Sequence, residues 1–212
     1  MNLSIFEGKP TSAKSLSLRK TVYGVGVNDS PFVTQITVDG KKLIHPAYDC
    51  WRQMLRRCYS PESLAKKPRY AGCTVSEDWL SFSCFLQWWR DNHVPGWQID
   101  KDILTGSKIY SVGSCIFVPK WVNTIITDSL ATRGDLLIGA TKHGRDGAIE
   151  AWARNTITNK QEYLGRYDSE LLANAAWKRR RIEIVDQLKA ELDMIDYRLH
   201  GRIVKIISER IV

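Results

Sequence analysis

Near the C-terminus, residues 150–154 alternate between side chains that can bind a ligand and small side chains that can only pack. Trp152 and Arg154 occupy even-numbered positions, and Ala151 and Ala153 occupy the odd-numbered positions between them. Successive side chains of a β-strand point to opposite faces of its sheet. The small alanines suit close packing against a helix, so we expect Trp152 and Arg154 on the free face. A guanidinium fork near an aromatic ring can hold phosphates or read guanine edges in a major groove.

The elements around this segment predict a three-stranded sheet backed by one helix. Strand-like runs cover residues 136–140, 149–156 and 161–167, and Asp168 is expected to cap a long helix that begins near Ser169. Further basic side chains lie in the first turn, at the end of the third strand and on the helix: Lys142, His143, Arg145, Arg166, Lys178, Arg179, Arg180 and Arg181. The helical run fits a solvated face as well as it fits phosphate contacts.

The overall charge favours a polyanionic partner. The chain has 212 residues and a formal net charge of +8, and its pI is about 9.3. Lysine and arginine replace the counterions that condense on phosphate, so a basic balance favours nucleic acid. The alternative is a basic protein with no such ligand.

The C-terminal segments resemble the APETALA-type, or ethylene-response-factor-type, DNA-binding domain. The similar segments are Ile138–Ala140, Glu150–Arg154, Tyr163–Asp168 and Glu170–Trp177, within residues 136–180. That family pairs a three-stranded sheet with one helix and binds double-stranded DNA through basic and aromatic sheet residues. The resemblance implies contacts from the sheet residues Lys142, Arg145, Trp152, Arg154 and Arg166. Lys178 and Arg179 are the candidates for phosphate contacts from the helical run.

Residues 99–123 resemble the HNH, or ββα-metal, nuclease finger of phage and intron-encoded endonucleases. Segments upstream of it, such as 51–59 and 70–75, are similar to phage proteins that join such a finger to an APETALA-type domain. In that family a divalent ion, Mg²⁺ or another metal, is held at the scissile phosphate while a base activates water. The resemblance implies that Asp100 and Asn123 hold the metal.

Two positions of the finger depart from the family pattern. Lys101 stands in place of the base histidine, and Ser114 in place of the asparagine that orients it. A lysine with an ordinary pKa of about 10.4 is a poor base at neutral pH. Burial would lower that pKa, but Asp100 and Asp102 would oppose the shift. The finger is therefore either a scaffold without activity or an enzyme that uses another base: Asp102, His93 or His45.

Three functional hypotheses follow. The first is a metal-dependent endonuclease of the HNH type that cuts or nicks double-stranded DNA. The second is a non-catalytic DNA-binding or regulatory protein, phage-encoded, on the same scaffold. The third is a phage protein that binds a host protein through exposed tryptophans.

The predicted fold class is α+β, with four segments along the chain. Residues 1–20 form a flexible arm, and residues 21–131 an HNH-like domain with an N-terminal hairpin and helices. Residues 135–192 form the APETALA-type domain, and residues 193–212 a helical extension. The amphipathic stretch 203–211 is expected to pack on its own domain or on a second copy in a homodimer.

Cysteine usage and hydropathy indicate the cellular compartment in which the protein is expected. The chain has five cysteines and no CxxC pair, which favours reduced thiols in the cytoplasm, that of the host cell if the protein is phage-encoded. Cys58, Cys73 and Cys115 could together bind a structural zinc ion, but their spacing matches no strong zinc-binding pattern, so zinc is not expected. No apolar run approaches the roughly 20 residues that a membrane span needs, so no membrane partner is expected.

Overall fold

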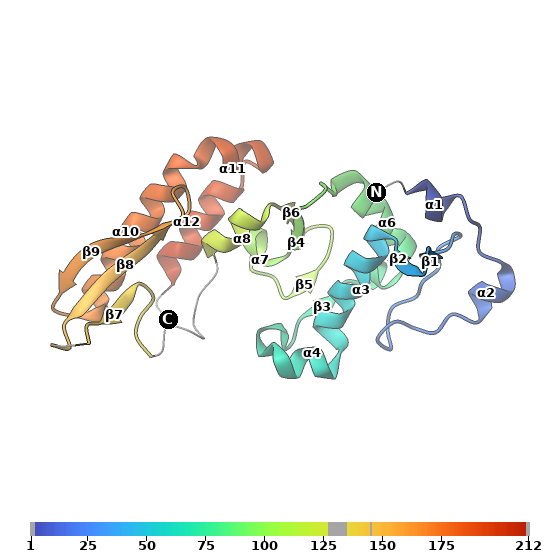
Figure 1. Cartoon of the computed structure of the whole chain (residues 1–212), viewed down its shortest axis with the longest axis horizontal. Coiled ribbons are helices and arrows are strands. Elements are labelled where there is room, and N and C mark those ends of the chain that lie inside the picture. The colour runs from blue at the N-terminus through green and yellow to red at the C-terminus, as the bar shows by residue number, and fades with distance from the viewer. Residues whose placement is uncertain (1–2, 127–134, 145, 211–212) are drawn as a thin grey trace. The chain divides into compact units, whose positions relative to one another are not determined.

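The chain is divided into two compact units. The computed structural model describes residues 3–126, 135–144 and 146–210 (Figure 1). Unit 1 covers Met1–Phe117 and unit 2 covers Val118–Val212, and both combine helices with small sheets, so the predicted α+β class is confirmed. The sequence placed the boundary near residue 131. It lies earlier because helix α8 (Lys120–Ile126) packs on the C-terminal helix α12 (Leu199–Glu209).

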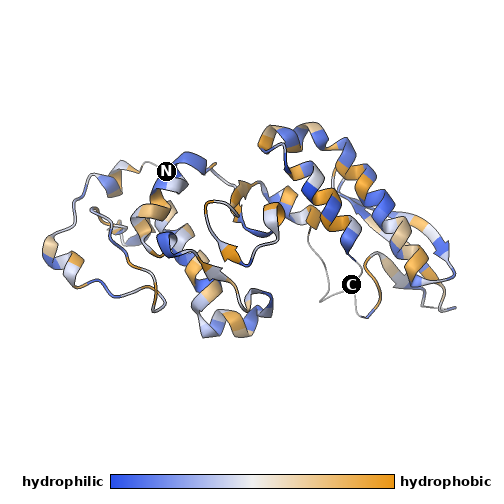
Figure 2. Cartoon of the chain, turned by 180° about the vertical axis from the view of Figure 1, so that it is seen from behind, coloured by the Kyte–Doolittle hydropathy of each residue, from blue (hydrophilic) through white to orange (hydrophobic). Residues whose placement is uncertain are grey.

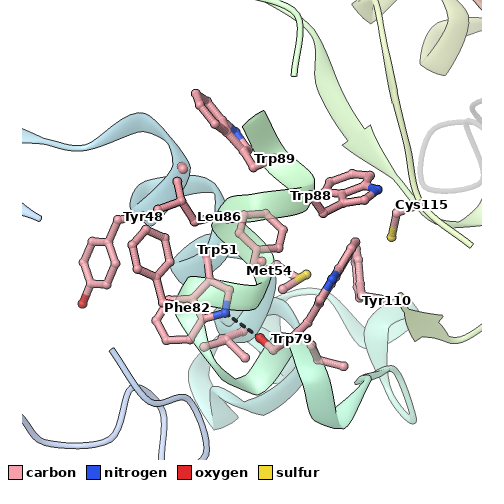
Figure 3. Packing of buried hydrophobic residues seen from close by; sticks show 14 of the residues in the cluster. Tyr48, Trp51, Met54, Trp79, Phe82, Leu86, Trp88, Trp89, Tyr110 and Cys115 are labelled. Atoms are coloured by element: carbon pink, nitrogen blue, oxygen red, sulfur yellow. Dashed lines mark hydrogen bonds between the residues drawn. The ribbon is translucent and has the colours of Figure 1, made fainter. Parts of the chain in front are cut away.

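The core of unit 1 is built on helices α3 (Pro46–Tyr59) and α6 (Phe82–Asn92). Pro46 stands in the first turn of α3, where its fixed φ suits a helix start and its missing N–H costs nothing. One face of α3 is buried, and its apolar residues recur at helical spacing: Tyr48, Trp51, Met54, Leu55 and Cys58. Figure 3 shows Tyr48 and Trp51 packed against Phe82 of α6, and the Trp51 indole N–H donates to the carbonyl of Trp79 at 2.7 Å.

Short elements surround these two helices. The described helices are α1 (Ser4–Glu7), α2 (Ala13–Ser17), α4 (Pro61–Lys66), the 3₁₀ helix η1 (Pro68–Tyr70), α5 (Glu77–Leu80) and α7 (Asp102–Thr105). The strands are β1 (Gln35–Val38), β2 (Lys41–Ile44), β3 (Thr74–Val75), β4 (Gln98–Asp100), β5 (Ile109–Tyr110) and β6 (Ile116–Val118). They form three pairs: antiparallel β1–β2, parallel β3–β5, and β4–β6. The β1–β2 hairpin was predicted, and its two turn residues Asp39 and Gly40 have φ of 49° and 73°, as a type I′ turn requires.

The first twenty residues differ from the flexible arm that the sequence predicts. Phe6 is fully buried in the core of unit 1, and its ring lies 5.4 Å from that of His45. Arg19 donates hydrogen bonds to the carbonyl oxygens of Asn28, Ser30 and Phe32. A buried aromatic ring and a multiply bonded guanidinium tie this segment to the unit.

His45 gives unit 1 a predicted pH dependence. The ring is fully buried, and burial lowers its pKa below the ordinary value of 6.5, although hydrogen bonding to Glu7 opposes the shift. The unfolded chain therefore binds a proton near pH 6.5 that the folded chain does not. Stability should fall as the pH drops below about 6.5, by at most roughly 1.4 kcal/mol per pH unit, until the folded pKa is reached.

Urea unfolding at pH 7.0, 6.0 and 5.0 tests this expectation. The His45→Gln variant, which cannot take up the proton, should show a smaller loss of unfolding free energy over this range. Equal pH dependence of the two proteins would assign the effect to other groups.

Unit 2 is a three-stranded antiparallel sheet with helices on one face. The strands are β7 (Ala140–Lys142), β8 (Ile149–Asn155) and β9 (Lys160–Tyr167), in the order β7-β8-β9. Helix α10 (Glu170–Gln187) packs on all three strands, and α11 (Lys189–Ile195) connects it to α12. The helix is capped by Ser169, whose hydroxyl accepts from the N–H of Leu172, rather than by Asp168 as expected. Figure 2 shows hydrophilic and hydrophobic residues interleaved along these helices.

The C-terminal extension belongs to the core of unit 2. Leu199, Ile203 and Ile207 are fully buried, and α12 packs on α10. Of the two alternatives predicted for this stretch, packing on its own domain is the one observed. None of the helices in the described ranges is both long and apolar enough to cross a membrane.

Candidate nucleic-acid interface

The register of β8 assigns the predicted residues to opposite faces of the sheet. Ala151 and Ala153 are buried at 0% and 1% exposure against the helix side, while Arg154 is exposed and Trp152 half-buried. The predicted alternation of this strand is therefore confirmed. We call the side that carries Trp152 and Arg154 the open face. Its other members follow from the strand pairing: Thr141, Glu150, Gln161, Tyr163 and Arg166.

Two aromatic rings form the centre of the open face. Tyr163 lies opposite Trp152 on the neighbouring strand, and the ring centroids are 5.0 Å apart. Tyr163 remains 50% exposed. Sequence alternation did not single out Tyr163, because a β-bulge in the β8–β9 pairing at Ala151 and Trp152 shifts the parity of β9. The rings give the face a flat apolar platform.

The charges on the open face are partly balanced. The Glu150 carboxylate accepts hydrogen bonds from the Trp152 indole and from Arg166, each at 3.3 Å. Arg166 also pairs with Asp146 at 3.0 Å. Hydrogen bonding from the Ala148 N–H, with help from Arg166, holds the pKa of Asp146 below its usual value. The charge of Arg166 is thus offset within the unit.

Arg154 differs from Arg166. Its guanidinium donates to the neutral side-chain amide oxygen of Asn159, in the turn that joins β8 and β9. No carboxylate in the described part of the chain pairs with it. Arg154 is therefore the arginine of the open face that offers an unbalanced charge to a ligand.

The other predicted contacts do not join this face. Lys142 pairs with Ile149, whose side chain packs toward the helix, so the register puts Lys142 on the helix side of the sheet. Lys178 donates to the carbonyl of Ser208 at 2.8 Å, and Arg179 is exposed on α10, the helix that covers the opposite side of the sheet. Arg145 lies outside the described residues. The structure brings together Trp152, Arg154 and Arg166 of the predicted set.

A buried arginine supports the strand that carries Arg154. Arg181 is 4% exposed, and its guanidinium donates at 2.6 Å to the carbonyls of Arg154 and of Ile125. Burial lowers its pKa to about 10, so it still carries its charge at neutral pH. Arg181 therefore joins β8 to the last turn of α8, where a cation near the final carbonyls is favourable.

Replacing Arg181 should destabilise unit 2. In Arg181→Met two buried carbonyls lose a charged donor, and we expect the free energy of unfolding to fall by about 1–3 kcal/mol. Urea unfolding measures the change. Arg179→Met is the matched control, because it removes the same charge from an exposed position of the same helix and should change stability by less than about 0.5 kcal/mol. Equal effects of the two variants would contradict the structural role of Arg181.

The residues of the nuclease-like finger have structural partners. One carboxylate oxygen of Asp100 accepts the backbone N–H groups of Asp102 and Ile103, each at 2.8 Å, at the start of α7. Burial raises the pKa of Asp100, although these N–H groups oppose the rise. The Ser114 hydroxyl donates to the carbonyl of Ile109 at 2.5 Å and accepts the N–H of Ser111. Both side chains thus stabilise turns of the chain.

Lys101 is a buried, charged residue. It is 4% exposed, its ammonium pairs with the Asp102 carboxylate and lies 5.5 Å from the centre of the Tyr110 ring. Burial acts to lower its pKa, but the contact with Asp102 raises it above the ordinary value. A raised pKa keeps Lys101 protonated at neutral pH, and a protonated ammonium cannot act as a general base.

The surroundings of Asp100 disfavour a divalent ion at this carboxylate. Two backbone amides already donate to one oxygen of Asp100, and a metal at this carboxylate would be repelled by the charge of Lys101. Asn123, the second predicted ligand, belongs to α8 in unit 2. Among the described residues no group of three or more His, Cys, Asp or Glu side chains is arranged to hold a metal ion.

The two histidines considered as alternative bases are packed against aromatic rings, and three of the five cysteines are buried. His45 is enclosed by Phe6, Phe32, Phe82 and Trp89, and the ring of His93 stacks on Trp89 at 4.0 Å. All five thiols are free, and burial raises the pKa of Cys58 and Cys115 to about 12. Protonated buried thiols behave as small apolar groups.

The chain matches no family model, no curated protein and no solved structure.

Proposed function

We propose that this protein binds double-stranded DNA through the open face of unit 2. The observation that carries the proposal is the arrangement of Arg154 beside the Trp152–Tyr163 pair, on the side of the sheet opposite α10. A narrow antiparallel sheet can enter the major groove of B-DNA, and an arginine fork can bind guanine O6 and N7 or a phosphate. The aromatic platform would pack against sugars or thymine methyl groups.

Arg166 has a conditional role in this proposal. Its bonds to Glu150 and Asp146 must be exchanged for bonds to phosphate when DNA binds, so its net contribution is smaller than that of Arg154. The charge of the unit as a whole is also modest. Unit 2 has 16 Lys and Arg against 13 Asp and Glu, which gives +3, and unit 1 carries the remaining +5 of the +8.

A salt titration tests the proposal. A fluorescently labelled pool of random-sequence duplexes, followed by anisotropy, should bind the full chain with an affinity that falls as the salt rises from about 50 to 200 mM. The logarithm of the association constant should fall linearly with the logarithm of the salt concentration, since counterions leave the phosphates. An affinity that does not change over this range would contradict DNA binding.

A protein partner is the second candidate. Tryptophan, tyrosine and arginine are the residues most enriched at protein–protein hot spots, and the pairing of Arg166 with Glu150 and Asp146 balances part of the charge, as a protein surface tolerates. This candidate predicts weak, salt-insensitive duplex binding that Arg154→Ala leaves unchanged. The titration above therefore distinguishes the two.

DNA cleavage is not part of the proposal. With Lys101 protonated, we expect a supercoiled plasmid incubated with the protein and Mg²⁺ or Mn²⁺ to stay supercoiled under conditions in which the protein binds it. Gel electrophoresis gives the result. Metal-dependent nicking that is lost in Asp100→Ala would restore the endonuclease hypothesis.

A further inference from the structure

Unit 2 contains a cleft between α8 and the β8–β9 turn, beside the open face. Its volume is about 400 Å³. The described lining residues come from α8, from the end of β8 and from the turn that follows it: Lys120, Trp121, Thr124, Arg154, Thr156 and Asn159. Arg154 belongs to the open face as well, so the cleft continues that face toward α8.

The described lining of the cleft combines one aromatic ring with two positive charges, and none of its six residues is a carboxylate. Trp121 supplies the ring, and Lys120 and Arg154 supply the charges. The Thr124 hydroxyl donates to the carbonyl of Lys120 at 3.0 Å and keeps its acceptor capacity. The Thr156 hydroxyl oxygen is buried and has no hydrogen-bond partner among the described residues.

The two walls of the cleft are held together from behind. Arg181 donates to the carbonyl of Arg154 on one wall and to that of Ile125 on the other. The turn is fixed by the side chain of Asn155, which accepts the N–H groups of Ile157 and Thr158, and Asn159 adopts a left-handed conformation with φ of 59°. A cleft with fixed walls loses less entropy on binding.

We propose that this cleft binds one nucleotide, with the base against the Trp121 indole and the 5′-phosphate between Lys120 and Arg154. An aromatic ring beside two cations matches a planar base linked to an anion, and stacking on an aromatic side chain tolerates any base. The volume lies within the range of small-ligand sites. The choice of a nucleotide rests on the proposed function, because Arg154 serves both surfaces; the source is either an unpaired nucleotide of a bound strand or a free nucleotide.

Calorimetric titration of the full chain with three probes tests the cleft itself. Deoxyadenosine monophosphate should bind at least roughly tenfold more tightly than inorganic phosphate or deoxyadenosine, because only it uses both the ring and the charges. Lys120→Gln should weaken its binding by about fivefold or more. Lys160→Gln, an exposed charge on the same hairpin but outside the lining, should leave it unchanged. In Trp121→Leu, checked for folding by thermal unfolding, the nucleotide should lose its advantage over phosphate.

Binding measurements with DNA duplexes distinguish the two sources of the nucleotide, and they also distinguish failure of the cleft proposal from failure of the proposed function. If a duplex with a single-nucleotide overhang binds more tightly than the blunt duplex, and Lys120→Gln abolishes the difference, the cleft binds an unpaired strand end. If the two duplexes bind equally well and nucleotide binding is retained, the cleft binds free nucleotides. Absence of nucleotide binding while blunt duplex binding persists overturns the cleft proposal and leaves the open face intact. Phosphate binding as tight as nucleotide binding also overturns it. Nucleotide binding without any duplex binding overturns the proposed function instead.

Discussion

We expect the Arg154→Ala variant to bind duplex DNA about 5- to 150-fold more weakly than the unchanged protein, a loss of roughly 1–3 kcal/mol. Arg154 is exposed on the open face, and no carboxylate among the described residues offsets its charge. Removal of its fork takes away both charge and directed hydrogen bonds. Anisotropy titration at fixed salt measures the loss.

Two further variants separate the causes of that loss. Arg154→Lys keeps the charge but not the fork, so it should recover part of the affinity if only phosphate is bound and little if a guanine is read. Lys160→Ala removes one charge from the same hairpin, but Lys160 pairs with Asn155 on the helix side of the sheet. Its effect should be small. An equal loss in Lys160→Ala and Arg154→Ala would show that net charge, and not the open face, determines binding.

The Gly139→Ala variant should lose about 2–5 kcal/mol of stability in unit 2. Gly139 has φ of +85°, which disfavours any side chain, and an added Cβ would lie 2.2 Å from Cγ of Trp177. Trp177 is itself buried under the sheet at 6% exposure, so it has no space to move away. Hydrogen exchange of the α10 amides reports the loss for this unit alone.

A matched glycine provides the control for that prediction. Gly144 lies in the same unit, and an added Cβ would meet nothing within 4 Å. Gly144→Ala should therefore leave the exchange of the α10 amides nearly unchanged. Comparable acceleration in both variants would mean that the close contact between Gly139 and Trp177 is not a determinant of stability.

The faces of β8 could be predicted from the sequence because its two small alanines alternate with larger side chains. Only the alanine face allows a helix to pack closely. The buried face of α3 was predictable for a similar reason, since its apolar residues recur at helical spacing. The bulge at Ala151 and Trp152 was not predictable, because it depends on the pairing of β8 with β9. Tyr163 was therefore missed, and Lys142 was assigned to the face that it does not share.

The candidate site of the finger could be predicted only in part. The neighbouring acids of Lys101 were visible in the sequence, but the net direction of its pKa shift was not, because burial opposes their effect. The engagement of Asp100 with two backbone amides was not visible, because it depends on the turn that starts α7. The position of α8 in unit 2 was equally hidden, since it depends on packing with α12, far along the chain. The cleft around Trp121 was missed for that reason.

The indole N–H signal of Trp152 in nitrogen–proton correlation spectra gives the most direct test of the open face. Assigned through the Trp152→Phe variant, it should move on addition of duplex DNA, while the signal of the buried Trp177 moves much less. If the Trp152 signal does not move when the protein is saturated with duplex DNA, binding through this face would be contradicted.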